Sequence, residues 1–270
     1  MSDVFAIVLM LFTGIGSAEQ PMPAPASQKL VWSDEFNYTG APDSSKWNYD
    51  IGDGCPNLCG WGNEELEYYT SRTENVRVEN GMLIIEARKE NYANRRYTSA
   101  KLVTRGIVDW QYGRIEVRAK LPSGRGTWPA IWMLPSQRRY GGWPADGEID
   151  IMEHVGHEPN HVYGSVHTEA YNHRDGTQKT AGMMEFEQPF EKHFHTYTID
   201  WTAERIEFLV DDIPYITFTN EHATFAEWPF DAPFYLILNI AVGGSWGGAL
   251  GIDDSIWPQR MEMDFVRVYQ

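Results

Sequence analysis

The chain has 270 residues, a formal net charge of −16 at pH 7 and 11 tryptophans. A chain this acidic repels phosphate backbones, so its composition argues against a nucleic-acid partner. Its length suits one large all-β domain and does not by itself predict a domain boundary. The many tryptophans favour a flat apolar ligand such as a sugar ring, while burial of all of them in the core stays open as an alternative.

The N-terminal segment has the pattern of an export signal. Residues 1–18 combine an apolar stretch with small residues at its end, although they contain no basic residue. Residues 19–28 are rich in Pro, Ala and Ser and predict an extended linker. We therefore expect a single domain over residues 29–270 of a secreted or periplasmic protein. The apolar stretch is too short to predict a membrane span, so we expect no membrane association.

The two cysteines, Cys55 and Cys59, lie in a loop-like segment with Pro and Gly around them. In an exported protein this spacing predicts a short disulfide, with two free thiols as the alternative. A metal site would need more ligands than this pair provides.

From residue 29 onward, short segments with period-two alternation are separated by Gly, Pro, Asn and Asp, and convincing helical periods are absent. Asp211 and Asp212 predict a hairpin turn between two such segments. About a dozen strands without an internal repeat predict an all-β fold, a jelly-roll sandwich of two antiparallel sheets. The clearest predicted strands are 82–88, 113–120, 147–154, 196–201, 205–210, 215–218, 235–242 and 261–269.

One predicted strand carries three carboxylic acids. In a regular strand Glu148 and Asp150 share one face, and Glu153 points to the other. A single β-bulge near Ile151 and Met152 restores the phase, turns Met152 into the core and places Glu153 beside Asp150.

Three carboxyl groups on one face repel one another and raise at least one pKa, which a purely structural sheet would avoid. Glycoside hydrolysis needs such a group: one carboxylate attacks or stabilises the anomeric carbon, and one protonated acid gives its proton to the leaving oxygen. The alternative, a solvated acidic strand edge, is disfavoured because Ile149, Ile151 and Met152 indicate a buried opposite face.

The segment EIDIME resembles the catalytic motif of glycoside hydrolase family 16, in the bulged form of its laminarinase branch. The resemblance extends over residues 29–270. It implies a concanavalin A-like jelly roll whose concave face forms a glucan cleft, endo-acting cleavage of β-1,3- or mixed β-1,3/1,4-glucan with retention, no cofactor for catalysis, and a monomer. The other similar segments are residues 61–70, 112–120, 128–134, 239–244 and 263–269.

The same resemblance implies individual roles. Glu148 matches the nucleophile, Asp150 the assisting acid and Glu153 the general acid/base. The positions that match substrate-binding or cleft residues are Asn63, Arg72, Trp128, Trp132, His167 and Trp246. A core role for the tryptophans and a structural role for His167 stay open. Glu35, Gly81 and Asp264 match the ligands of a structural calcium ion, whose preference is for oxygen.

Three other interpretations of the sequence are disfavoured. Residues 157–161 match the H-E-x-x-H pattern of zinc proteases, but Pro159 argues against the helix that this pattern requires. A non-catalytic β-glucan-binding protein would have no use for Glu148 and Glu153. A hydrolase of lichenan, agar or carrageenan would use similar carboxylates, but the bulged motif favours the laminarinase branch.

Overall fold

The computed structural model describes residues 28–184 and 187–270. The predicted export signal and all but the last residue of the predicted linker lie outside these residues. The described part contains strands and one 3₁₀ turn, η1 (Cys59–Gly62), but no α-helix. The strands are β1 (Leu30–Asp34), β2 (Asn48–Tyr49), β3 (Glu67–Tyr69), β4 (Val76–Glu79), β5 (Met82–Tyr92), β6 (Arg95–Ser99), β7 (Lys101–Val103), β8 (Gly113–Lys120), β9 (Thr127–Pro135), β10 (Glu148–Glu153), β11 (His161–His167), β12 (Lys179–Met184), β13 (His195–Trp201), β14 (Arg205–Val210), β15 (Ile213–Thr219), β16 (Phe234–Val242) and β17 (Gln259–Tyr269).

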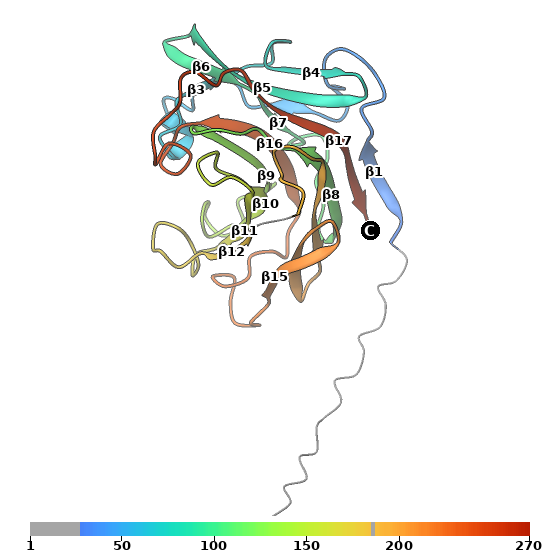
Figure 1. Ribbon diagram of the computed structural model, residues 1–270. Helices are drawn as coiled ribbons and strands as arrows, with labels where there is room; N and C mark the ends of the chain where they lie inside the picture. The colour runs from blue at the N-terminus through green and yellow to red at the C-terminus, as the bar shows by residue number, and fades with distance from the viewer. Residues whose placement is uncertain (1–27, 185–186) are drawn as a thin grey trace, which may run out of the picture.

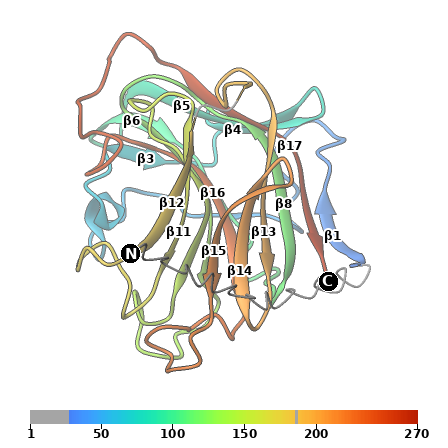
Figure 2. The same ribbon diagram turned by 60° about the horizontal axis from the view of Figure 1, so that its bottom comes forward.

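The strands form two sheets that pack face to face, which confirms the predicted all-β sandwich (Figures 1 and 2). The larger sheet has ten strands in the order β15-β14-β13-β8-β17-β5-β6-β3, with β1 paired to β17 and β4 paired to β5. The smaller sheet has the order β12-β11-β10-β9-β16-β7-β2.

The strand pairs of the two sheets are antiparallel, as predicted, except at one edge, where β3 and β6 pair in parallel. Two strands, β4 and β5, lie between them in the sequence. A connection of that length allows β3 to enter the sheet in the parallel direction, which a tight hairpin does not.

The core lies between the two sheets and follows the alternation in the sequence. In β8 the side chains of Ile115, Val117 and Ala119 are fully buried, while those between them are half-buried. Strand β16 is buried at every position. One face packs in the core, and on the other face Asn239 is covered by its hydrogen-bond partners Trp132 and Tyr69. In the smaller sheet β16 pairs with β9, which in turn pairs with β10, the strand of the three carboxylic acids.

Two local predictions concern loops. Asp211 and Asp212 both have positive φ, 49° and 63°, as the tight hairpin between β14 and β15 requires. Residues 157–160 form turns, and His161 begins β11, so the helix needed for a zinc protease is not formed. Among the described residues, no helix has the length and apolar character needed to cross a membrane.

Candidate active site

Strand β10 lies between β9 and β11 and contains the predicted bulge. Across β9, Asp150 pairs with Trp132 and Glu153 pairs with Ala130, and the register shifts between Asp150 and Met152. The pairing with β11 shifts over the same segment. Met152 is buried in the core, as predicted. The bulge therefore places all three carboxyl groups on the face of the smaller sheet that points away from the core.

The register brings distant residues into one row beside Glu153. Lys101 of β7 pairs with Asn239 of β16, which pairs with Ala130 of β9. Ala130 pairs with Glu153, which pairs with Tyr163 of β11. Because paired residues share a face, these five residues form a line across five strands. A polymer that contacts this row crosses the strands of the sheet.

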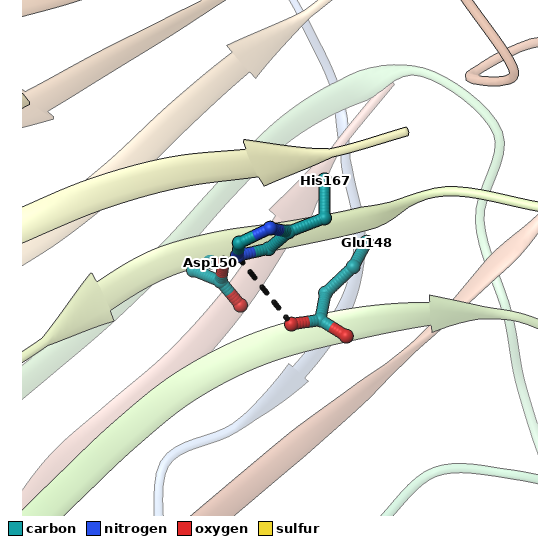
Figure 3. A group of neighbouring side chains, drawn as sticks. All are labelled: Glu148, Asp150 and His167. Carbon is teal, nitrogen blue, oxygen red and sulfur yellow. Dashed lines mark ion pairs between the residues drawn. The ribbon is translucent and has the colours of Figure 1, made fainter. Parts of the chain in front are cut away.

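His167, predicted as a cleft residue, pairs with Glu148 across β10 and β11. Figure 3 shows its imidazole reaching toward Glu148 and Asp150. Its Nε2 lies 3.3 Å from an Asp150 carboxylate oxygen and 3.9 Å from one of Glu148. One potential ligand atom from each of the three residues lies within 4.8 Å of the others, a spacing that would also admit a cation.

Burial dominates the electrostatics of the three carboxyl groups. It raises the pKa of Glu148 to about 8, with a further contribution from Asp150, and raises the pKa of Glu153 to about 7. The pKa of Asp150 lies well above its usual value because the group is buried and faces Glu153. At neutral pH the site therefore retains protons that exposed carboxylic acids would lose.

Glu153 opens on a cavity of about 330 Å³ lined on one side by Asn63, Trp128 and Trp246. The Trp128 indole donates a hydrogen bond of 3.1 Å to Glu153, and its ring meets that of Trp246 edge-on at 5.7 Å. Asn63 approaches through the loop in which its carbonyl accepts from the Ser245 N–H. These three predicted binding residues are therefore brought together beside the predicted acid.

Trp132 lies on the same face as Trp128, as the spacing of four residues predicted. Its indole donates a hydrogen bond of 2.7 Å to Asn239, whose amide donates to the Tyr69 hydroxyl. That hydroxyl donates in turn to Glu65. The chain of buried hydrogen bonds fixes the orientation of the Trp132 ring at the cleft.

Lys101 is a functional candidate that the sequence did not reveal. It is 7% exposed, and its ammonium lies 4.3 Å from the ring centre of Trp61 and 4.8 Å from that of Trp132. Burial lowers its pKa. Together with Glu153 and Asn239 it lines a second cavity of about 60 Å³. Its position in a short buried strand could have indicated a function, because lysine is rarely buried unless a partner compensates its charge.

Trp61 lies in η1, next to the Cys55–Cys59 disulfide. The predicted disulfide is thus formed and closes the loop that precedes this tryptophan. Two further residues that the sequence did not single out, Trp143 and His173, lie against His167, with ring centres 6.1 Å and 5.2 Å away from it.

Arg72 does not line either cavity beside Glu153. Its guanidinium pairs with Glu90, donates a 2.9 Å hydrogen bond to Asn75 and lies over the Tyr92 ring at 4.4 Å. The structure therefore does not bring Arg72 together with the carboxylates. The physical reason is the long β5–β6 hairpin, which supplies both a carboxylate and a ring to the arginine.

The residues predicted to bind calcium do not fit an ion as they stand. Both carboxylate oxygens of Glu35 accept from Arg267, at 3.0 and 2.7 Å. The Asp264 carboxylate lies 2.5 Å from Arg118. Gly81 lies in the turn between β4 and β5. Two of the three proposed ligands are therefore neutralised by arginines, which a calcium ion would have to displace.

Known proteins share both the sequence and the fold. Residues 63–267 match the model of glycosyl hydrolases family 16. A β-glucanase of Rhodothermus marinus is 56% identical over 250 residues, covering 90% of this chain and 85% of that protein. The laminarinase structure from Rhodothermus marinus has a TM-score of 0.86 at 55% identity, covering 90% of this chain and 97% of that chain.

A second solved structure contains a sugar. It is a variant of a non-specific endo-β-1,3(4)-glucanase co-crystallized with 1,3-β-D-cellotriosyl-glucose, with a TM-score of 0.85 at 50% identity over 93% of this chain and 98% of that chain. The sequence and the fold both agree with those of these proteins, and the chain belongs to glycosyl hydrolases family 16.

Proposed function

We propose that the protein is an endo-acting β-glucanase that cleaves β-1,3-glucan, and mixed β-1,3/1,4-glucan as well, with retention of anomeric configuration. The observation that carries the proposal is the bulge in β10, which aligns Glu148, Asp150 and Glu153 beside a cavity walled by Trp128 and Trp246. The similarity to β-glucanases and laminarinases supports the choice of substrate.

In the first step the Glu148 carboxylate attacks the anomeric carbon while Glu153 gives its proton to the leaving oxygen, and the glycosidic bond breaks. In the second step Glu153 accepts a proton from water, whose oxygen bonds to the anomeric carbon and releases Glu148. The raised pKa of Glu153, about 7, keeps this acid protonated up to neutral pH.

Glu148 must be ionised for attack, although burial raises its pKa to about 8. Asp150 meets this requirement by holding the proton itself. Glu148 then stays ionised and accepts a hydrogen bond from the protonated Asp150. The imidazole of His167, whose Nε2 lies 3.9 Å from a Glu148 oxygen, lowers the pKa of Glu148 and acts in the same direction. Asp150 and His167 are thus positioning residues for the nucleophile.

The main alternative from another class is a β-glucan-binding protein without catalysis. A binding module needs the aromatic walls but gains nothing from three neighbouring carboxyl groups that repel one another. A hydrolase of agar or carrageenan would use the same acids with other cleft walls. The retained acids and the similarity to glucanases favour glucan hydrolysis.

We further propose that the protein is exported, as a secreted or periplasmic monomer, because its polymeric substrate does not enter cells. The N-terminal apolar stretch and the Cys55–Cys59 disulfide support an oxidising compartment. Catalysis would require no metal, since the carboxyl groups supply both nucleophile and acid.

The test is reducing-end release from laminarin, barley mixed-linkage glucan and carboxymethylcellulose, with product sizes resolved. Rapid appearance of short oligosaccharides from laminarin, with cellulose untouched, is the expected result. Binding to laminarin without cleavage would leave a recognition module and overturn the proposal.

A further inference from the structure

A polar chamber lies on the β11–β12 side of Glu153. It is part of the cavity of about 330 Å³, a volume within the range of small-ligand sites, about 300–1,000 Å³. Its walls beyond the predicted binding residues offer hydroxyl, amide and imidazole groups: Tyr163, Ser165, His173, Gln178 and Thr180. Such groups suit the hydroxyls of a sugar.

His173, an exposed residue of the β11–β12 loop, lines this chamber, and its loop is closed by hydrogen bonds. Asn172, which is 1% exposed, donates to the carbonyls of Thr168 and Glu169 at 3.3 and 3.1 Å, and accepts from the Asp175 N–H at 3.1 Å. The loop between β11 and β12 is therefore closed around one buried amide. The next residue, His173, projects from a fixed backbone.

The His173 ring bridges two walls of the site. Its centre lies 5.0 Å from that of Trp143, in the β9–β10 connection, and 5.2 Å from that of His167 on β11. Within residues 28–184 and 187–270 its ring nitrogens have no hydrogen-bond partner. Burial, with His167 and Arg174 nearby, lowers the pKa of His173, so the neutral ring offers one donor and one acceptor.

Glu153 lines both this chamber and the 60 Å³ cavity of Lys101 and Trp132 on its other side. The proposed acid must face the departing sugar, and only the larger cavity has room for a sugar ring. The leaving group, and any sugar that later replaces it, therefore belongs in the chamber of His173.

We propose that His173 binds the sugar acceptor in this chamber and so sets the ratio of transglycosylation to hydrolysis. The inference rests on the proposed function. In the transfer step the bond between Glu148 and the anomeric carbon breaks, an acceptor hydroxyl oxygen bonds to that carbon, and the hydroxyl proton passes to Glu153. Water competes for the same position.

The experiment uses the whole protein with p-nitrophenyl β-laminaribioside as donor and laminaribiose as acceptor at increasing concentration. Nitrophenol release reports formation of the glycosyl-enzyme, and chromatography separates transfer from hydrolysis products. His173→Ala should lower the transfer-to-hydrolysis ratio about tenfold, the loss expected for a hydrogen bond or two to the acceptor. His173→Gln, which keeps a donor and an acceptor, should recover part of it.

His222→Ala is the matched control, because His222 is exposed and pairs with Glu204 at 2.9 Å outside the cavity. An unchanged ratio in His173→Ala, equal losses of transfer and hydrolysis, or a wild type that hydrolyses without any transfer would overturn the inference. If the wild type releases no nitrophenol and no reducing ends from laminarin, the proposed function itself fails.

Discussion

Two groups of carboxylic acids, one on each sheet, have opposite surroundings. On the ten-stranded sheet, Glu86 is 1% exposed and contacts Arg77, Arg88 and Arg260. Glu35 on the same side has a lowered pKa because Arg267 donates to it. On the seven-stranded sheet, Glu148 and Glu153 are half-buried, but the described residues place no arginine against them, and their pKa values rise because they are withdrawn from water.

The comparison teaches that burial alone does not decide the state of a carboxylic acid. Paired with guanidinium groups, a buried carboxylate stays ionised and contributes to the fold. Without such partners it retains its proton, which costs stability at high pH but supplies an acid for catalysis. Glu86 and Glu35 therefore represent a structural use of carboxylates, and Glu148 and Glu153 a chemical use.

The largest expected effect is a loss of activity when a catalytic carboxylate, but not a structural one, is replaced. Glu148→Gln or Glu153→Gln should lower kcat on laminarin by at least about 10⁴-fold, because each removes a reacting group. Glu86→Gln should retain activity within about twofold. For Glu148→Ala, azide should restore turnover and give an α-glycosyl azide, identified by NMR. Near wild-type activity in Glu148→Gln would remove the proposed nucleophile.

The second prediction concerns stability, which the structural carboxylate Glu86 should affect strongly. Glu86→Gln should lower the free energy of unfolding by about 2–3 kcal/mol, because three guanidinium groups lose their shared partner. Urea unfolding followed by tryptophan fluorescence measures this. Glu262→Gln, which breaks the half-exposed pair with Lys120, is the control and should cost less than about 1 kcal/mol. Equal effects of the two changes would contradict a special role for Glu86.

The third prediction is a gain in stability, in contrast to the loss expected for Glu86→Gln. Burial raises the pKa of Glu148 to about 8 and raises that of Asp150 as well, so the folded pair keeps a proton, held by Asp150 in the active form, that the unfolded chain loses first. Stability therefore falls as pH rises from about 4.5 to 8. Glu148→Gln removes this loss and should stabilise the protein at pH 8 by roughly 1–2 kcal/mol, or about 3–6 °C in Tm. At pH 4 the two proteins should melt together. A variant less stable than wild type at pH 8 would refute the argument.

The fourth prediction concerns the pH profile. Activity should fall as pH rises through the pKa of Glu153, about 7, because the acid must be protonated. The Trp128 N–H donates to Glu153 and favours the ionised form of that acid. Trp128→Phe should therefore raise the pKa of Glu153 and move the alkaline limb of kcat/KM upward by about half a pH unit. Trp228→Phe is a control, since that buried indole has no hydrogen-bond acceptor in the described residues. A shift common to both variants would not come from Glu153.

The smallest effect tests the predicted calcium ion. Because arginines already neutralise Glu35 and Asp264, adding Ca²⁺ to chelator-treated protein should raise Tm by less than about 2 °C. A larger, saturable increase that disappears in Asp264→Asn would instead restore the predicted site.

The sequence by itself determined most of the strands and the carboxylate motif. Alternation with a period of two is a local property, so β8 and β14 have the predicted bounds and the bulge at Met152 follows from spacing alone. Tertiary structure decided which strands become neighbours. Lys101 and Asn239 join Glu153 through β7 and β16, the β5–β6 hairpin removes Arg72 from the site, and β3 pairs in parallel with β6. Strand pairing joins residues far apart in the chain, and local periodicity contains no information about that choice.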